Sequence, residues 1–126
     1  MIDIRTIRIG SHVSVDGKRA RVIGIERSGL IELEATDGDL LRVLINDVEP
    51  ISLTPELLTE IGFEEDKTDI VKRVSGYFIY FHQINNLRWR VSLEEENCTV
   101  YGNTLCRHLH EAEAFLALHG VELIPD

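Results

Sequence analysis

The central segment of the chain, residues 50–63, reads PISLTPELLTEIGF and carries both a start and a stop signal for one short helix. Thr54 can cap the helix with its hydroxyl, and Pro55 fits the first helical position. Gly62 can take the left-handed conformation that ends many helices. A helix of about two turns is not stable by itself in water. It must therefore pack on neighbouring structure through its apolar side chains, Leu57, Leu58 and Ile61.

This segment divides the 126 residues into two small regions, 1–52 and 53–126. Neither region is long enough to guarantee a core of its own. We therefore expect the segment to form packing that both regions share, rather than a linker. Its large apolar residues are Leu53, Leu57, Leu58, Ile61 and Phe63.

Residues 1–52 contain short apolar runs that turn signals separate at regular spacing. Asp16-Gly17 is the strongest of these signals, because this pair suits the two-residue turn of a β-hairpin. Gly29 and Gly38 mark two further turns. Four or five short antiparallel strands fit between the turns, which is typical of a small SH3-like barrel. Closure into a barrel would also remove exposed strand edges.

Three basic residues beside the first hairpin, Lys18, Arg19 and Arg21, are the candidates for nucleic-acid binding. The alternative is an exposed strand whose charges keep a sheet edge soluble, and two observations favour it. The net charge of −9 opposes binding to a phosphate backbone. In addition, no aromatic residue precedes Phe63, so the first region lacks a base-stacking platform.

Residues 64–126 predict a polar loop, four antiparallel strands and a C-terminal helix. The strands fall at residues 70–74, 77–81, 87–93 and 98–101, and the helix extends over residues 104–119. The whole chain is therefore predicted as α+β: a barrel, a short capped helix, a four-stranded antiparallel sheet and a final helix. The apolar face of that final helix consists of Leu105, Leu109, Ala112 and Leu116.

The strand from Tyr77 to Phe81 is apolar on both of its faces. Such a strand lies either at the centre of a covered sheet or at an interface. It is therefore the candidate surface for a protein partner or for self-association.

The strand at residues 87–93 alternates cleanly between apolar and polar side chains. Arg88 and Arg90 should point outward, opposite Trp89, and form either an anion contact or an ordinary exposed face. Together with His82 and His110, they are the candidate ligand-binding residues. The side chains expected to point inward are Leu87, Trp89, Val91 and Leu93.

The final helix is rich in possible metal ligands, but their spacing argues against a metal site. Cys106 and His110 would share a helix face at i, i+4, whereas His108 would lie on another face. Neither H-E-x-x-H nor C-x-x-C occurs in the chain. We therefore predict a solvated helix face with packed histidines and no metal. The residues considered are Cys106, His108, His110, Glu111, Glu113 and His119.

The two cysteines, Cys98 and Cys106, are too few for a disulfide framework and fit ordinary thiols. A Cys–His nucleophile is the alternative for either of them, but it has no supporting motif. No phosphate-binding loop motif is present, and paired catalytic carboxylates cannot be assigned from spacing alone. We predict no catalytic residue and no cofactor, and a non-enzymatic role is favoured.

No apolar run approaches the roughly 20 residues that a membrane span needs. The first residues also lack the basic region and the apolar stretch of a signal peptide. A cytoplasmic location is therefore expected, without contact to a membrane.

Three segments together resemble a group of uncharacterised proteins that is common in Bacteroidetes genomes and in their phages and mobile elements. The first is Arg8-Ile9-Gly10, and the second is the central segment. The third lies in the last helix and contains Leu109-His110-Glu111, Leu116, Leu118 and Gly120-Val121. This helix departs from the group at residues 112–114, where the group tends to have Leu-Gln-His. The resemblance implies an architecture and a source, and no known activity.

The sequence thus favours a small non-enzymatic binding or accessory protein that derives from a phage or mobile element. Two alternatives stay open. One is a ligand-sequestering protein or enzyme that uses a cleft between barrel and sheet. The other is a nucleic-acid-binding module that uses the barrel. Neither the ligand nor the partner can be identified from the sequence.

Overall fold

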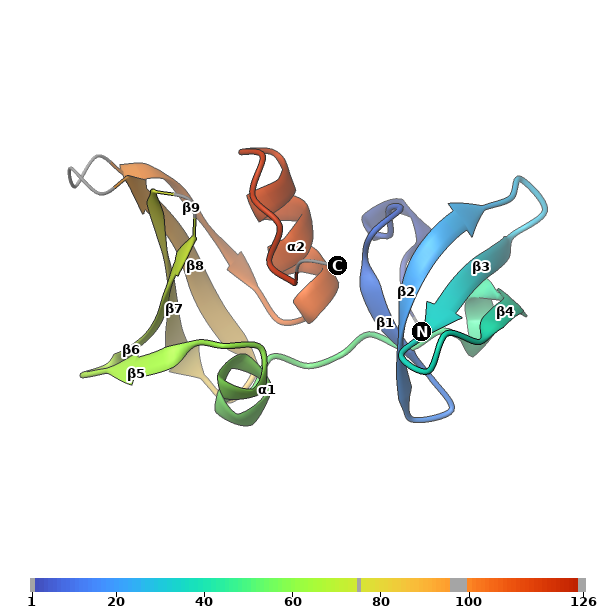
Figure 1. Ribbon diagram of the computed structural model, residues 1–126, viewed down its shortest axis with the longest axis horizontal. Helices are drawn as coiled ribbons and strands as arrows, with labels where there is room; N and C mark the ends of the chain where they lie inside the picture. Colours follow the sequence, from blue (N-terminus) through green and yellow to red (C-terminus); the bar gives the residue numbers. More distant parts are fainter. Residues whose placement is uncertain (1, 75, 96–99, 125–126) are drawn as a thin grey trace. The chain divides into compact units, whose positions relative to one another are not determined.

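The computed structural model describes residues 2–74, 76–95 and 100–124 (Figure 1). The chain divides into two compact units. The first combines Met1–Ser52 with His108–Ala114, and the second combines Leu53–Arg107 with Phe115–Asp126. Each unit contains one antiparallel sheet, and helices accompany the sheets, so the fold is α+β as predicted.

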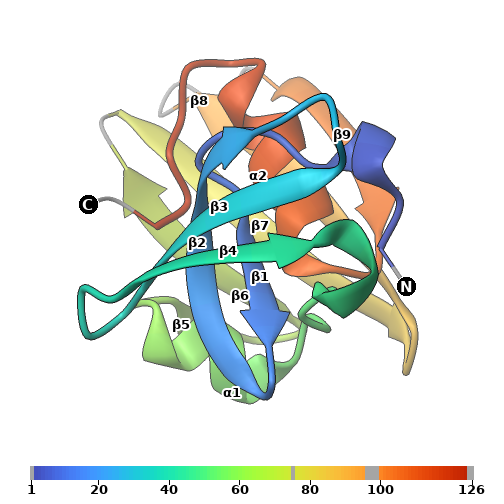
Figure 2. The ribbon, with the colours of Figure 1, turned by 90° about the vertical axis from the view of Figure 1, so that its right-hand side faces the viewer.

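The sheet of the first unit has four strands in the order β1-β2-β3-β4 (Figure 2). Its bounds are β1 (His12–Val15), β2 (Lys18–Ile25), β3 (Leu30–Ala35) and β4 (Leu40–Leu44). The short 3₁₀ turns η1 (Ile4–Thr6) and η2 (Ile45–Asp47) precede and follow the sheet. One face of the sheet buries a core that includes Val13, Val22, Ile31, Leu33 and Val48.

The turn between β1 and β2 confirms the predicted hairpin. Asp16 and Gly17 have positive φ angles of 51° and 79°. Val15 pairs with Lys18 directly across them. A two-residue turn with both φ angles positive matches the right-handed twist of the strands that it joins.

The first sheet is open, with β1 and β4 at its two edges. After β4, η2 turns the chain back, and Glu49 exchanges two backbone hydrogen bonds with Ser14 of β1, at 2.9 and 2.8 Å. This contact is an isolated bridge and not a strand. The closed SH3-like barrel expected from the sequence is therefore not established.

Helix α1 (Pro55–Glu60) lies in the second unit and confirms the signals of the central segment. The Thr54 hydroxyl oxygen accepts the N–H of Leu57 at 3.1 Å. At the other end, Gly62 has a φ of 103°, and the N–H of Phe63 donates to the carbonyl of Leu58 at 2.9 Å. Leu58 and Phe63 are both buried, so this short helix is held by packing as expected.

The sheet of the second unit has five strands in the order β5-β6-β7-β8-β9. The sequence predicted four, because residues 64–66 are polar and resemble a loop. These residues form β5 through backbone pairing with β6. The bounds are β5 (Glu64–Asp66), β6 (Asp69–Val74), β7 (Tyr77–Asn85), β8 (Arg88–Glu95) and β9 (Val100–Cys106).

Helix α2 (Leu109–Ala117) is shorter than the predicted helix at residues 104–119. Residues 104–106 extend β9 instead, where Cys106 pairs with Trp89 and Leu105 pairs with Arg90. Strand pairing thus overrides the local helical periodicity. As a result, Leu105 is 51% exposed, although the helical pattern placed it on the buried face.

One other orientation was predicted wrongly. Trp89, Val91 and Leu93 are buried as expected, whereas Leu87 is 63% exposed. Leu87 precedes β8 and belongs to the turn after β7, so strand alternation does not apply to it. The predicted strand at residues 98–101 begins at Val100 in β9, and Cys98 lies outside the described residues.

Among the residues that the structure describes, no helix has the length and apolar character needed to cross a membrane.

Candidate functional site

The sheet of the second unit has one face that its own unit covers. Side chains alternate between the two faces along each strand. Ile79, Phe81 and Trp89 point to the covered face and are fully or almost fully buried. The opposite face, called the outer face below, includes Asp69, Val71, Arg73, Phe78, Tyr80, His82, Arg88, Arg90, Ser92, Glu94 and Leu105.

A row of aromatic rings fixes which face is covered. The Phe81 ring lies edge-on to Phe63, with ring centroids 5.2 Å apart, and 6.4 Å from the ring of Trp89. The indole N–H of Trp89 donates to the carbonyl of Leu53 at 3.1 Å. These contacts join β7 and β8 to the segment around α1. The alternate side chains of the same strands must therefore point away from it.

Two aromatic side chains of the central strand β7 lie on the outer face. The ring centroids of Phe78 and Tyr80 are 6.2 Å apart, and both residues are half-buried. Arg73 of β6 pairs with Phe78, and Val71 pairs with Tyr80. The sequence prediction identified Tyr77 to Phe81 as a possible interface, and Phe78 and Tyr80 of this strand are only partly buried.

A second row of side chains crosses the outer face beside the aromatic pair. Asp69 pairs with His82, His82 pairs with Arg90, and Arg90 pairs with Leu105. Nδ1 of His82 lies 2.9 Å from the carboxylate of Asp69. The row therefore combines an acid, an imidazole, a guanidinium and an exposed leucine, which suits a mixed polar and apolar contact.

The structure brings together three of the four predicted ligand-binding residues. His82, Arg88 and Arg90 share the outer face, and the N–H of Arg88 donates to the side-chain oxygen of Asn85 at 3.0 Å. His110 belongs to the first unit. Sequence reasoning missed Arg73 and Leu105 as members of this surface, because only the strand register shows which residues lie beside Phe78 and Arg90.

His110 is buried, with 2% of its surface exposed. The hydroxyl of Thr6 donates to the carbonyl of Asp3 at 2.7 Å, so Nε2 of His110 must donate to the Thr6 oxygen, at 3.0 Å. Nδ1 is then unprotonated, and it has no hydrogen-bond partner among the described residues. Burial lowers the pKa of the His110 imidazole below its usual value. This imidazole is therefore kept neutral in the interior of the first unit.

The other acidic and histidine residues of this region pair with one another. Glu113 binds His12, which the sequence prediction did not anticipate, because the two residues are far apart in the chain. His108 has its N–H and its Nδ1 near the Glu111 carboxylate, at 2.9 and 3.2 Å, and its ring stacks on that of His110. These contacts stabilise the fold: the Glu113 contact holds the start of β1, and the His108 contact holds the start of α2.

Within the described residues, no group of three histidine, cysteine or acidic side chains is arranged to hold a metal ion. Cys106 is buried in β9 and does not share a helix with His110. The shared helix face that the sequence suggested for these two residues therefore does not exist.

The basic residues of the first hairpin do not form an uncompensated positive patch. Lys18 is exposed, but the guanidinium of Arg21 donates to the Glu34 carboxylate at 3.0 Å. Arg19 lies between them on β2 and is half-buried. This pairing weakens the case for a phosphate-binding surface at this position.

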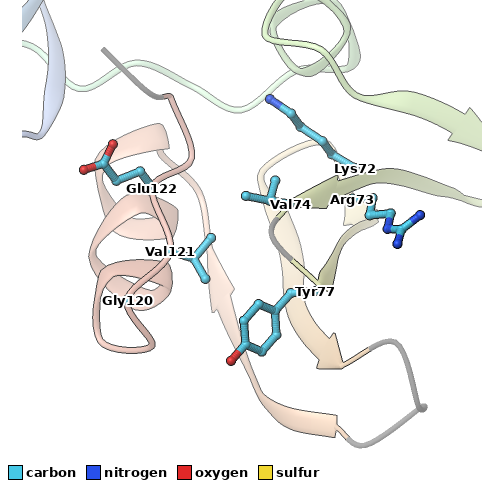
Figure 3. A pocket seen from close by; sticks show the side chains of 7 residues that line it. All are labelled: Lys72, Arg73, Val74, Tyr77, Gly120, Val121 and Glu122. Atoms are coloured by element: carbon cyan, nitrogen blue, oxygen red, sulfur yellow. The ribbon is translucent and has the colours of Figure 1, made fainter.

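A pocket of about 440 Å³ lies on the covered side of the second sheet (Figure 3). Val74 and Val121 face each other across it, and the ring of Tyr77 lies below them (Figure 3). The Lys72 ammonium is committed to the carbonyl of Ile61, at 3.0 Å. None of the residues predicted to bind a ligand lines this pocket. Its lining consists of Lys72, Arg73, Val74, Tyr77, Gly120, Val121 and Glu122.

Comparison with known proteins gives no relative: no family model, no curated protein and no solved structure matches this chain. The resemblance to the Bacteroidetes group therefore stays a prediction.

Proposed function

We propose that this protein is a non-enzymatic binding or accessory protein, and that a protein partner docks on the outer face of its second sheet. The observation that carries the proposal is the pair of half-buried aromatic rings, Phe78 and Tyr80, on the central strand of that face. Aromatic and arginine side chains contribute most of the binding energy in many protein interfaces. Arg73 and Arg90 flank the pair on the two neighbouring strands.

The charges of the outer face favour a protein over a nucleic acid. Glu94 pairs with Phe78 in the strand register, and Asp69 pairs with His82. Carboxylates therefore alternate with the arginines, whereas a phosphate backbone needs an excess of positive charge. A protein surface with its own acidic and basic groups can match such an alternation.

Site-specific crosslinking tests the proposal. A photoreactive phenylalanine analogue is placed at Phe78, in cells that produce the full chain, and a matched analogue is placed at the exposed residue Thr59 of α1. We expect an adduct with one protein at position 78, its loss when Arg90→Glu is added, and no such adduct at position 59. An adduct that is independent of position, or one that Arg90→Glu leaves unchanged, contradicts the proposal.

A second candidate function is the binding of a small apolar molecule in the pocket between Val74 and Val121. The pocket volume of about 440 Å³ lies in the range typical of ligand sites. Filling the pocket with Val74→Phe should abolish the fluorescence increase of an anilinonaphthalene sulfonate probe. Ser92→Thr on the outer face is the control. Equal probe binding by both variants would exclude this pocket.

Other expectations from the sequence stay predictions. We infer that the first unit is an SH3-like variant, and the succession of four strands, η2 and the Glu49 bridge to Ser14 supports this. The same holds for four other expectations: the phage or mobile-element origin, the cytoplasmic location, the enzyme in a cleft and the nucleic-acid module on the barrel.

A further inference from the structure

Strand β4 is an edge strand with a largely apolar sequence. It reads LLRVL, and within the described residues it pairs with β3 alone (Figure 2). Leu40 is 71% exposed and Leu44 is 53% exposed. Natural edge strands usually carry charges, prolines or bulges that prevent pairing with another chain. β4 has no proline and pairs with β3 in an unbroken register, so it lacks these protections apart from Arg42.

The hydrogen-bonding pattern of β4 shows which backbone groups face the open edge. In the ladder with β3, the carbonyl of Asp39 accepts from Ala35, and the N–H of Ile45 donates to Gly29. In an antiparallel ladder, every second residue directs its N–H and C=O to the same neighbour. Since the register is continuous, the odd-numbered residues bond to β3. Leu40, Arg42 and Leu44 therefore direct their backbone groups to the open edge.

We propose that β4 pairs with β4 of a second copy of this chain, in antiparallel orientation, about a two-fold axis at Arg42. In this register Leu40 lies opposite Leu44 of the second copy, and Arg42 lies opposite its own counterpart. The three residues whose backbone groups face the open edge are then the three that would exchange hydrogen bonds. The two four-stranded sheets become one continuous sheet.

The side chains are self-complementary in the same register. Leu40 and Leu44 point to one face of the sheet, and each covers the other across the axis. On the opposite face, Leu41 lies opposite Val43 of the second copy. A two-fold axis requires this kind of match, because one strand must complement itself when it is reversed. Pairing with an unrelated strand would not require β4 to match its own reversed sequence. The second copy is therefore the favoured occupant.

The charge at the axis is compensated within each copy. Arg42 donates to both carboxylate oxygens of Glu26, at 2.9 and 2.8 Å, and lies 4.0 Å from the carboxylate of Glu32. Two arginines would meet at the axis, but four carboxylates would surround them. This arrangement lowers the repulsion that a like-charged pair opposite each other otherwise causes.

Sedimentation of the full chain over a range of concentrations tests the association. We expect a monomer–dimer equilibrium, and Leu44→Lys should lower the association constant about a hundredfold, because the lost burial occurs twice in the symmetric pair. Leu118→Lys is the matched control, since Leu118 is 81% exposed and lies in the second unit. A wild-type chain that stays monomeric throughout, or equal effects of the two variants, overturns the proposal.

Disulfide trapping tests the register separately. In a Cys98→Ser background, Arg42→Cys places two thiols directly opposite each other, within the range that a disulfide spans. Leu41→Cys moves the thiols apart along the strands. We expect oxidised dimers from Arg42→Cys and few from Leu41→Cys on a non-reducing gel. Equal trapping, or trapping of Leu41→Cys alone, contradicts the two-fold axis at Arg42.

Discussion

Glu113 holds His12 through both of its carboxylate oxygens. Oε2 lies 2.6 Å from Nδ1 of His12, and Oε1 accepts the backbone N–H of the same residue at 2.7 Å. The two side chains are only 11% and 10% exposed. Within the first unit, this double contact joins helix α2 to the first residue of β1.

Replacing the carboxylate by an amide should weaken this junction. Glu113→Gln keeps an oxygen that can accept the N–H of His12 but removes the charge next to the imidazole. We expect a loss of about 2–4 kcal/mol in the free energy of unfolding, measured by urea denaturation. Glu122→Gln, at an exposed position, should change it by less than about 0.5 kcal/mol. Equal effects would show that the pair contributes little.

The neutral imidazole of His110 predicts a dependence of stability on pH. Its pKa is lowered in the folded protein, from an ordinary value of about 6.5. Above about pH 6.5 the group is neutral in both states. As the pH falls below that value, the unfolded chain binds a proton that the folded chain does not, and stability is lost.

The variant His110→Gln tests this assignment, because its amide can still donate to Thr6 but does not titrate. We expect a shallower fall of the unfolding free energy between pH 6.5 and the onset of acid denaturation. His82→Gln is the control, since the His82 side chain is 44% exposed, whereas His110 is buried. If the His110→Gln profile keeps the slope of the wild type, another group is responsible.

The cap of α1 gives a prediction about local stability. Thr54→Ala removes the acceptor for the N–H of Leu57 and should cost about 0.5–2 kcal/mol. Thr54→Ser keeps the hydroxyl and should retain most of the stability. Thermal unfolding of both variants distinguishes the hydrogen bond from the loss of the methyl group.

Leu58 is fully buried, and its truncation tests the role of the central segment. Leu58→Ala should destabilise the protein by about 2–5 kcal/mol. The shared packing expected from the sequence further predicts a single unfolding transition that moves as a whole. Two transitions, of which the variant shifts only that of the second unit, would contradict shared packing and show that the segment acts as a linker.

The sequence predicts best where the signal is local. Thr54, Pro55 and Gly62 define the bounds of α1, and Asp16-Gly17 defines a hairpin, because caps and tight turns depend on a few neighbouring residues. The alternation of Trp89, Val91 and Leu93 also identifies their buried face correctly.

Prediction fails where a partner elsewhere in the chain decides the structure. Leu105 and Cys106 fit a helical pattern, yet β8 recruits them into β9. The polar residues Glu64 and Glu65 form a strand because their backbone pairs with β6. The candidate surface shows the same limit, since only the register places Arg73 beside Phe78 and Leu105 beside Arg90.

The first unit is discontinuous in sequence, since His108–Ala114 completes it after the second unit has intervened. The returning segment supplies Glu113 to His12 and His110 to Thr6. A fragment that stops at Ser52 would therefore lose both of these contacts. In evolutionary terms, neither unit can be exchanged or duplicated by a single recombination event without breaking the other, so the two are expected to be inherited together.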